Sequence, residues 1–194
     1  MEYISTRNSK KTFSFTDVFL KGLAPDGGLF VPQKIPKYSS QELMNLKNLS
    51  YNELAENVIL KFCGDTFSGE EIKEIVHNSY KNFRVENVVK IKKLEKINFL
   101  ELFHGPTLAF KDIAMQVIGN MYEKILKKNK IKINIVVATS GDTGAAAISA
   151  IKGRKNMKIF VLHPDNKISN VQRKFMTTVD SKNVFNIAVA SNFD

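Results

Sequence analysis

One lysine of this 194-residue chain lies in a setting that suits covalent chemistry. Lys111 follows a turn at His104-Gly-Pro, and apolar residues from Leu108 recur at three- and four-residue steps. This pattern predicts a buried helix over 108–127 with Thr107 as its N-cap. The positive end of a helix dipole and desolvation both favour a neutral amine over an ammonium. A neutral amine in a pocket can form a Schiff base with a carbonyl compound, although a lysine here can also extend into solvent.

A second candidate site follows a strand predicted over 131–139. The loop Ser140-Gly-Asp-Thr-Gly144 leads from this strand into a helix predicted over 143–152. A glycine-containing turn between a strand and a helix directs backbone N–H groups to one point, where they can bind an anion. Ser140 and Thr143 add hydroxyl donors to these N–H groups. An ordinary tight turn is the alternative, and the loop alone does not decide between the two.

Together the two segments resemble one enzyme family. HGPTLAFKD at 104–112 and ATSGDTGAA at 138–146 are similar to the signatures of threonine synthases. These are pyridoxal-phosphate-dependent enzymes of fold type II. The resemblance extends over the whole chain, since 3–7, 22–32 and 163–169 also look like segments of that family.

The resemblance implies a role for several of these residues. Lys111 would form the Schiff base with pyridoxal 5'-phosphate and then move protons between substrate carbons. Ser140, Gly141 and Thr143 would bind the substrate carboxylate. Asp142 would be a cofactor-binding residue that faces the ring oxygen of the cofactor, or would be hydrogen-bonded in another way.

Further site residues come with weaker expectations. His104 and Thr107 would shape the floor of the active site or contact the substrate, although a histidine in a turn can be purely structural. Lys167 and Ser169 would bind the substrate phosphate, with a solvated lysine and a helix N-cap as the alternative. For Asp112 we expect a structural role at the start of the helix. No metal site is expected.

The implied reaction converts O-phospho-L-homoserine and water to L-threonine and phosphate. A close alternative is a threonine-synthase-like phospho-lyase, which releases a 2-oxo acid, ammonia and phosphate. In this family the glycine-rich loop for the cofactor phosphate and the residue at the pyridine nitrogen come later than residue 194. We therefore expect these 194 residues alone to lack activity, and a complete protein to be a monomer or homodimer.

Composition bears on the remaining classes of protein. The formal charge is +10, from 29 basic and 19 acidic residues, which would suit a non-enzymatic nucleic-acid-binding module. The lysines are scattered, however, and no nucleic-acid-binding motif accompanies them, so no nucleic-acid partner is expected. Cys63 is the only cysteine and is expected in the core. Without a secretory signal or a membrane-length apolar run, we expect a cytoplasmic protein and no membrane partner.

The periodicity also predicts the fold. After residue 103, helices at 108–127, 143–152 and 169–177 alternate with strands at 131–139, 158–162 and 184–190. This alternation predicts the start of a doubly wound parallel sheet, here incomplete, of the kind found in fold-type-II pyridoxal phosphate enzymes. We place a small N-terminal α+β domain at 1–97 and the first part of the catalytic domain at 98–194. Ser14, Ser40 and Ser50 are expected helix N-caps, and 191–194 the cap of a further helix.

Overall fold

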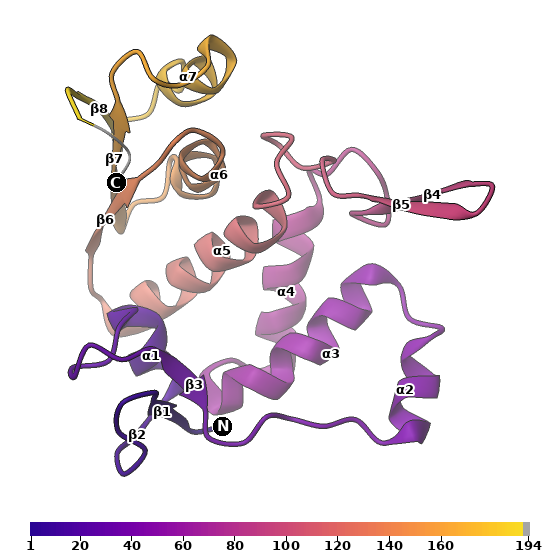
Figure 1. Ribbon diagram of the computed structural model, residues 1–194. Helices are drawn as coiled ribbons and strands as arrows, with labels where there is room; N and C mark the ends of the chain where they lie inside the picture. Colours follow the sequence, from indigo (N-terminus) through magenta and orange to yellow (C-terminus); the bar gives the residue numbers. More distant parts are fainter. Residues whose placement is uncertain (192–194) are drawn as a thin grey trace. The chain divides into compact units, whose positions relative to one another are not determined.

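A computed structural model describes residues 1–191, and they divide into two compact units (Figure 1). The first unit runs from Met1 to His77 and the second from Asn78 onward. Helix α4 (Gly69–Tyr80) spans the boundary between them. The domain boundary that the sequence suggests at 97/98 stays a prediction. The expected helix cap at 191–194 lies largely outside the described residues.

The first unit combines a small antiparallel sheet with short helices. Its elements are β1 (Tyr3–Ser5), β2 (Thr12–Phe13), α1 (Phe15–Lys21), β3 (Phe30–Pro32), α2 (Ser40–Leu46), α3 (Tyr51–Cys63) and η1 (Gly64–Thr66). The strand order is β2-β1-β3. Cys63 is 1% exposed, as expected for a core residue, and burial raises the pKa of its thiol to about 12.

Serine caps set where the helices of this unit begin. The hydroxyls of Ser14 and Ser50 accept the backbone N–H three residues on, and the side chains of Asp17 and Glu53 return the contact. These are capping boxes, and they confirm both predictions. The third prediction is wrong by one residue, because Ser39 and not Ser40 caps α2: the Glu42 side chain that completes this box lies three residues after Ser39.

The second unit contains a hairpin followed by a parallel α/β segment. Its elements are β4 (Lys90–Leu94), β5 (Ile97–Glu101), α5 (Asp112–Asn129), β6 (Ile133–Ala138), α6 (Asp142–Ile151), β7 (Met157–Pro164), α7 (Asn170–Thr177) and β8 (Val184–Val189). Strands β6, β7 and β8 are parallel and adjacent in that order. The expected α/β class and parallel sheet are therefore confirmed.

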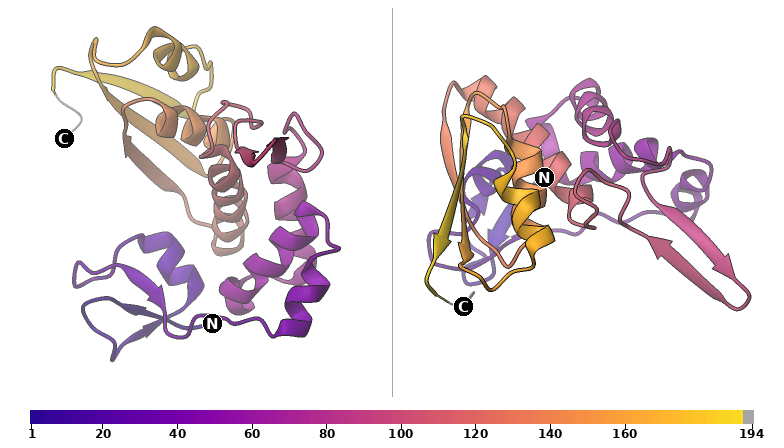
Figure 2. Two further views of the ribbon diagram at one scale, coloured as in Figure 1. Left: turned by 45° about the vertical axis from the view of Figure 1, so that its right-hand side comes forward. Right: turned by 90° about the horizontal axis from the view of Figure 1, so that it is seen from above.

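The helices of this segment pack on one face of the parallel sheet (Figure 2). Ile159 and Val161 of β7 point to that face and are 0% exposed, and they meet the nearly all-apolar helix α6. Successive connections of the same hand place their helices on the same side of a sheet. On the opposite face Val136 is 69% and Ile187 42% exposed. The carboxyl ends of the strands all lie at one edge, where α/β proteins bind ligands.

Helix α5 differs from its prediction at the amino end. It begins at Asp112 and not at residue 108, and Thr107 is not its N-cap. Leu108 has a φ of 63°, a left-handed conformation that cannot continue a right-handed helix. The helix is also amphipathic and not buried on all sides, since Ala114 is exposed while Val117 and Met121 are buried.

Two further features complete the fold. The β4–β5 hairpin extends away from the rest of its unit and exposes most of its apolar side chains (Figures 1 and 2). Within residues 1–191, no helix is both long and apolar enough to cross a membrane.

Candidate functional site

Lys111 lies at the junction between a tight turn and helix α5. It is the N-cap residue of α5 and already has helical backbone angles. The side chain is half-buried, and its Nζ lies 4.9 Å from the centroid of the Phe110 ring. An aromatic face attracts a cation and also shields an amine from water on one side. The lysine is therefore held at a helix start and remains accessible, as a reactive amine must be.

Asp112 fixes the turn that precedes this lysine. Its carboxylate is 0% exposed and accepts two hydrogen bonds from Thr107, from the backbone N–H at 2.8 Å and from Oγ1 at 2.7 Å. Gly105 packs directly against it, and a Cβ at Gly105 would lie only 2.5 Å from Asp112 Oδ2. A larger residue therefore cannot replace Gly105 without moving the carboxylate. The expected structural role of Asp112 is thus anchoring of the whole 105–112 turn.

A buried threonine holds the loop Ser140–Gly144 on its inner side through hydrogen bonds. Thr139 is 2% exposed, and its Oγ1 accepts hydrogen bonds from the N–H groups of Gly141 and Gly144, both at 3.0 Å. Within residues 1–191 the N–H groups of Asp142 and Thr143 donate to no protein acceptor, as is normal in the first turn of a helix. These two N–H groups are unpaired donors at the start of α6, next to the hydroxyl-bearing residues Ser140 and Thr143. Binding of an anion by this loop stays a prediction.

A contact from helix α7 closes this loop on its other side. Gln172 Nε2 donates to Asp142 Oδ1 at 2.9 Å, and Gln172 Oε1 accepts from Ser169 Oγ at 3.0 Å. Ser169 is the N-cap of α7, since its Oγ also accepts the N–H of Gln172 at 3.2 Å. Gly141, with a φ of 142°, leaves room for Gln172, because a Cβ there would lie 2.6 Å from Gln172 Cδ.

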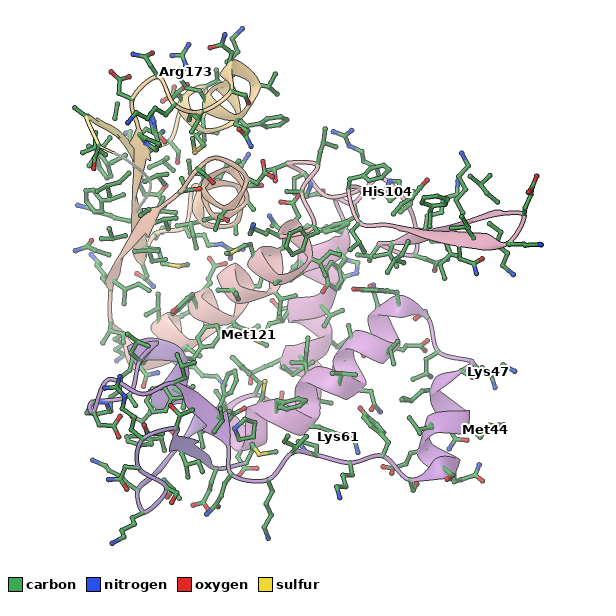
Figure 3. The ribbon with its side chains drawn as sticks, in the orientation of Figure 1. Met44, Lys47, Lys61, His104, Met121 and Arg173 are labelled. Carbon is green, nitrogen blue, oxygen red and sulfur yellow. The ribbon has the colours of Figure 1, made fainter. Side chains whose placement is uncertain are left out.

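His104 occupies the base of the β4–β5 hairpin, where Figure 3 labels it. Its Nε2 lies 2.9 Å from Glu101 Oε2, and both side chains are largely buried. The carbonyl of His104 accepts the N–H of Arg84 at 2.9 Å. In this structure His104 thus joins the end of β5 to the segment before the hairpin, which is the structural alternative for this residue.

The two helices that follow the turn and the loop lie against each other. Gln116 donates to Ser149 Oγ at 3.3 Å, and Gly119 packs on the backbone of Ala150. Further along α5, Glu123 pairs with Arg154, which lies just after the end of α6. These contacts follow the same order along α5 and α6, so the amino ends of both helices lie on the same side of the contact. Lys111 and the Ser140–Gly144 loop mark those two ends.

The segment after β7 supplies the remaining predicted residues. Lys167 and Ser169 are exposed and precede α7, at the carboxyl edge of the parallel sheet. His163, at the end of β7, is 5% exposed, and its Nδ1 has no hydrogen-bond partner within residues 1–191. Both observations place polar groups at this edge, which is where ligands bind in parallel α/β sheets.

The structure therefore groups the predicted residues in three places. Lys111 and Thr107 belong to the anchored turn, the Ser140–Thr143 loop contacts the start of α7 with Ser169, and His104 pairs with Glu101. No role for Gln172 could be predicted from the sequence, because its partner Asp142 is 30 residues away. In the sequence, Thr139 is only a polar residue at the end of an apolar strand. That pattern does not distinguish a threonine that holds a loop from one that simply ends a strand.

This geometry defines an α/β chain with a lysine at one helix start and a loop with unpaired N–H donors at another. Comparisons with known proteins agree with it. The family model "Threonine synthase N terminus" matches residues 2–80. The threonine synthase of Pseudomonas aeruginosa is 43% identical over 195 residues, which cover 100% of this chain and 42% of that protein.

Solved structures give the same result. The pyridoxal-phosphate-bound threonine synthase of Brucella melitensis superposes with a TM-score of 0.93 at 40% identity, covering 100% of this chain and 42% of that one. Threonine synthase from yeast superposes with a TM-score of 0.93 at 38% identity, covering 99% of this chain and 41% of that one. Over its whole length the chain matches the N-terminal portion of threonine synthases. It spans about two fifths of the length of these relatives.

Thr139 provides a direct test of the loop geometry. Replacing Thr139 by Val keeps the shape but removes the acceptor for two buried N–H groups, so we expect the free energy of unfolding to fall by about 2–4 kcal/mol. Equilibrium urea unfolding measures this change. Thr139→Ser keeps the hydroxyl and should retain most of the stability, and Thr178→Val, at the exposed C-cap of α7, should have little effect. Equal stability of Thr139→Val and the parent chain would contradict the anchoring role.

Proposed function

We propose that this chain provides the lysine-bearing part of a threonine synthase that acts on O-phospho-L-homoserine with pyridoxal 5'-phosphate. One observation carries the proposal. An accessible amine lies at the start of α5, and unpaired N–H groups lie at the start of α6, on the same side of the two packed helices. The threonine synthases that the chain matches over its whole length, one of them with pyridoxal phosphate bound, support this assignment.

The donor groups in the structure fit such a cofactor and substrate. A primary amine can bond to the cofactor's carbonyl carbon, and Lys111 Nζ is half-buried but accessible. The carboxylate of an amino-acid substrate needs N–H and O–H donors, which Asp142, Ser140 and Thr143 supply. When bound, pyridoxal phosphate withdraws electrons from the bonds around the substrate's α carbon.

The proposed roles of this chain's residues follow from their positions. Lys111 would give and take protons at substrate carbons, since it lies half-buried at a helix start with its Nζ next to the Phe110 ring. Lys167 and Ser169, at the carboxyl edge of the sheet, would bind the phosphate of the substrate. Thr107 would help to shape the site by holding Asp112 and the turn, and His104 would do so through its contact with Glu101. Asp142 would present its Oδ2 toward the cofactor's ring oxygen.

The remaining expectations stay proposals as well. We propose that these 194 residues alone do not turn over substrate, because the relatives that they match are more than twice as long. Measurable threonine formation by the purified chain would contradict this. The cytoplasmic location, and a monomer or homodimer as the complete state, remain predictions from the sequence.

Chemical trapping tests the role of Lys111. The 194-residue chain is mixed with less than one equivalent of pyridoxal phosphate, reduced with borohydride and digested for peptide mapping by mass spectrometry. We expect Lys111 to carry most of the label, because its amine is partly desolvated while most other lysines are solvated. The variant Lys111→Ala should lose this label, and Lys130→Ala, at the far end of α5, should keep it. Label spread evenly over the lysines would contradict the assignment.

A chimera tests the reaction. The matching N-terminal portion of the Pseudomonas aeruginosa threonine synthase is replaced by this chain, and products from O-phospho-L-homoserine are identified. We expect L-threonine and phosphate, and a chimera with Lys111→Ala should fold but lose activity by at least about a thousandfold, as expected when a covalent catalytic group is removed. Release of a 2-oxo acid and ammonia in place of threonine would support the phospho-lyase instead. A folded chimera as inactive as its Lys111→Ala control would also contradict the proposal.

A further inference from the structure

The loop proposed to bind a carboxylate carries a carboxylate of its own. Asp142 is the first residue of α6, beside the unpaired N–H groups of Asp142 and Thr143. The amino end of a helix attracts negative charge, so an aspartate at this position is drawn to the same N–H groups that a ligand would use. Because it belongs to the protein, its effective concentration there is high. An unrestrained Asp142 would therefore compete with an anionic ligand.

Gln172 provides the restraint. Its Nε2 donates to Asp142 Oδ1 at 2.9 Å, and its Oε1 accepts from Ser169 Oγ at 3.0 Å. One orientation of the amide makes both contacts, and the Asp142 contact requires it, since the reversed amide would place an oxygen against a carboxylate. Gln172 is half-buried, and its side chain packs against Gly141, where even a Cβ would be too close. The position of this amide is thus determined by three neighbours.

We propose that Gln172 is a positioning residue that holds the Asp142 carboxylate away from the N–H groups of the loop and so keeps them available to the ligand's carboxylate. The Ser169 contact gives the arrangement a second consequence. Because Ser169 caps α7, the same amide fixes the spacing between the Ser140–Gly144 loop and the segment at Lys167–Ser169. This inference deepens the proposed function and rests on it for the identity of the ligand.

Amide hydrogen exchange tests the restraint without any ligand. In Gln172→Ala, the released carboxylate approaches the start of α6, so the amides of Asp142 and Thr143 should exchange about three- to tenfold more slowly, since a nearby anion protects them. In Asp142→Ala/Gln172→Ala exchange should return to the rate found with Asp142→Ala alone. NMR of the 194-residue chain measures both rates. If Gln172 were only structural, its loss would loosen the loop and exchange at Thr143 would become faster, which would overturn the proposal.

Two further variants separate loss of the amide from a general effect of mutating α7. Gln172→Met keeps the length of the side chain but makes no hydrogen bond, and should behave like Gln172→Ala even if the smaller residue destabilises α7. Val171→Ala, at a neighbouring residue that is 65% exposed, should leave the exchange rates of Asp142 and Thr143 unchanged. A slowing as large in Val171→Ala as in Gln172→Ala would contradict a specific role for the amide.

Ligand binding separates this inference from the proposed function. With O-phospho-L-homoserine as the probe and the chimera described above as the protein, Gln172→Ala should bind about tenfold more weakly than the parent chimera, and Asp142→Ala/Gln172→Ala should regain most of that loss. Recovery on removal of a second residue is not expected if Gln172 only stabilises the fold. If neither the parent nor any variant binds this probe while the exchange rates change as described, the substrate is wrong and the restraint stands. Equal affinity of the parent and Gln172→Ala would overturn the restraint.

Discussion

The buried carboxylate of Asp112 is the interaction on which the candidate site depends most. Burying a charged group is costly unless hydrogen bonds replace its water, and Thr107 supplies two of them. Only glycine fits at 105, so the turn packs directly on this carboxylate. As a result the helix cannot begin earlier than this turn. The chain makes one tight turn and starts the helix at Asp112, with Lys111 immediately before it.

The Ser140–Gly144 loop is also held by side-chain hydrogen bonds, but from different residues. Thr139 holds two N–H groups of the Ser140–Gly144 loop from the buried side, and Gln172 holds Asp142 from the exposed side. What is left between these two anchors is a small set of N–H and O–H donors. Parallel strands bring such loops to a common edge, and the contacts between α5 and α6 bring Lys111 to the same side of the helix pair. Fixed polar groups of this kind can bind an anion without rearranging first.

Much of this could be predicted from the sequence because it depends on local chemistry. The serine at 50 with glutamate three residues later determines a helix start, and the apolar run before Ser140 determines a strand. The start of α5 could not be predicted in this way. Helical periodicity begins at Leu108, but the left-handed backbone there and the capture of Thr107 by Asp112 depend on packing around the turn.

The roles of Gln172 and His104 illustrate a second limit. Gln172 contacts Asp142 across 30 residues of sequence, and nothing near either residue marks the pair. His104 has two possible interpretations, and its contact with Glu101, at the end of β5, shows only how the ring is held. Whether the ring also contacts the substrate stays a prediction. Residue types and spacing thus suggest candidate loops, while tertiary contacts determine how each side chain is held.

The most direct test of this account concerns the link between Asp112 and Lys111. Pyridoxal phosphate is added in less than one equivalent, and the fraction of borohydride-trapped label on Lys111 is compared between the parent chain, Asp112→Asn and the exposed control Asp180→Asn. The account predicts that the fraction on Lys111 falls at least about fivefold in Asp112→Asn, because an amide cannot accept both bonds from Thr107, and stays constant in the control. If Asp112→Asn remains folded by circular dichroism and labels Lys111 like the parent, the turn does not depend on this carboxylate and the central claim is wrong.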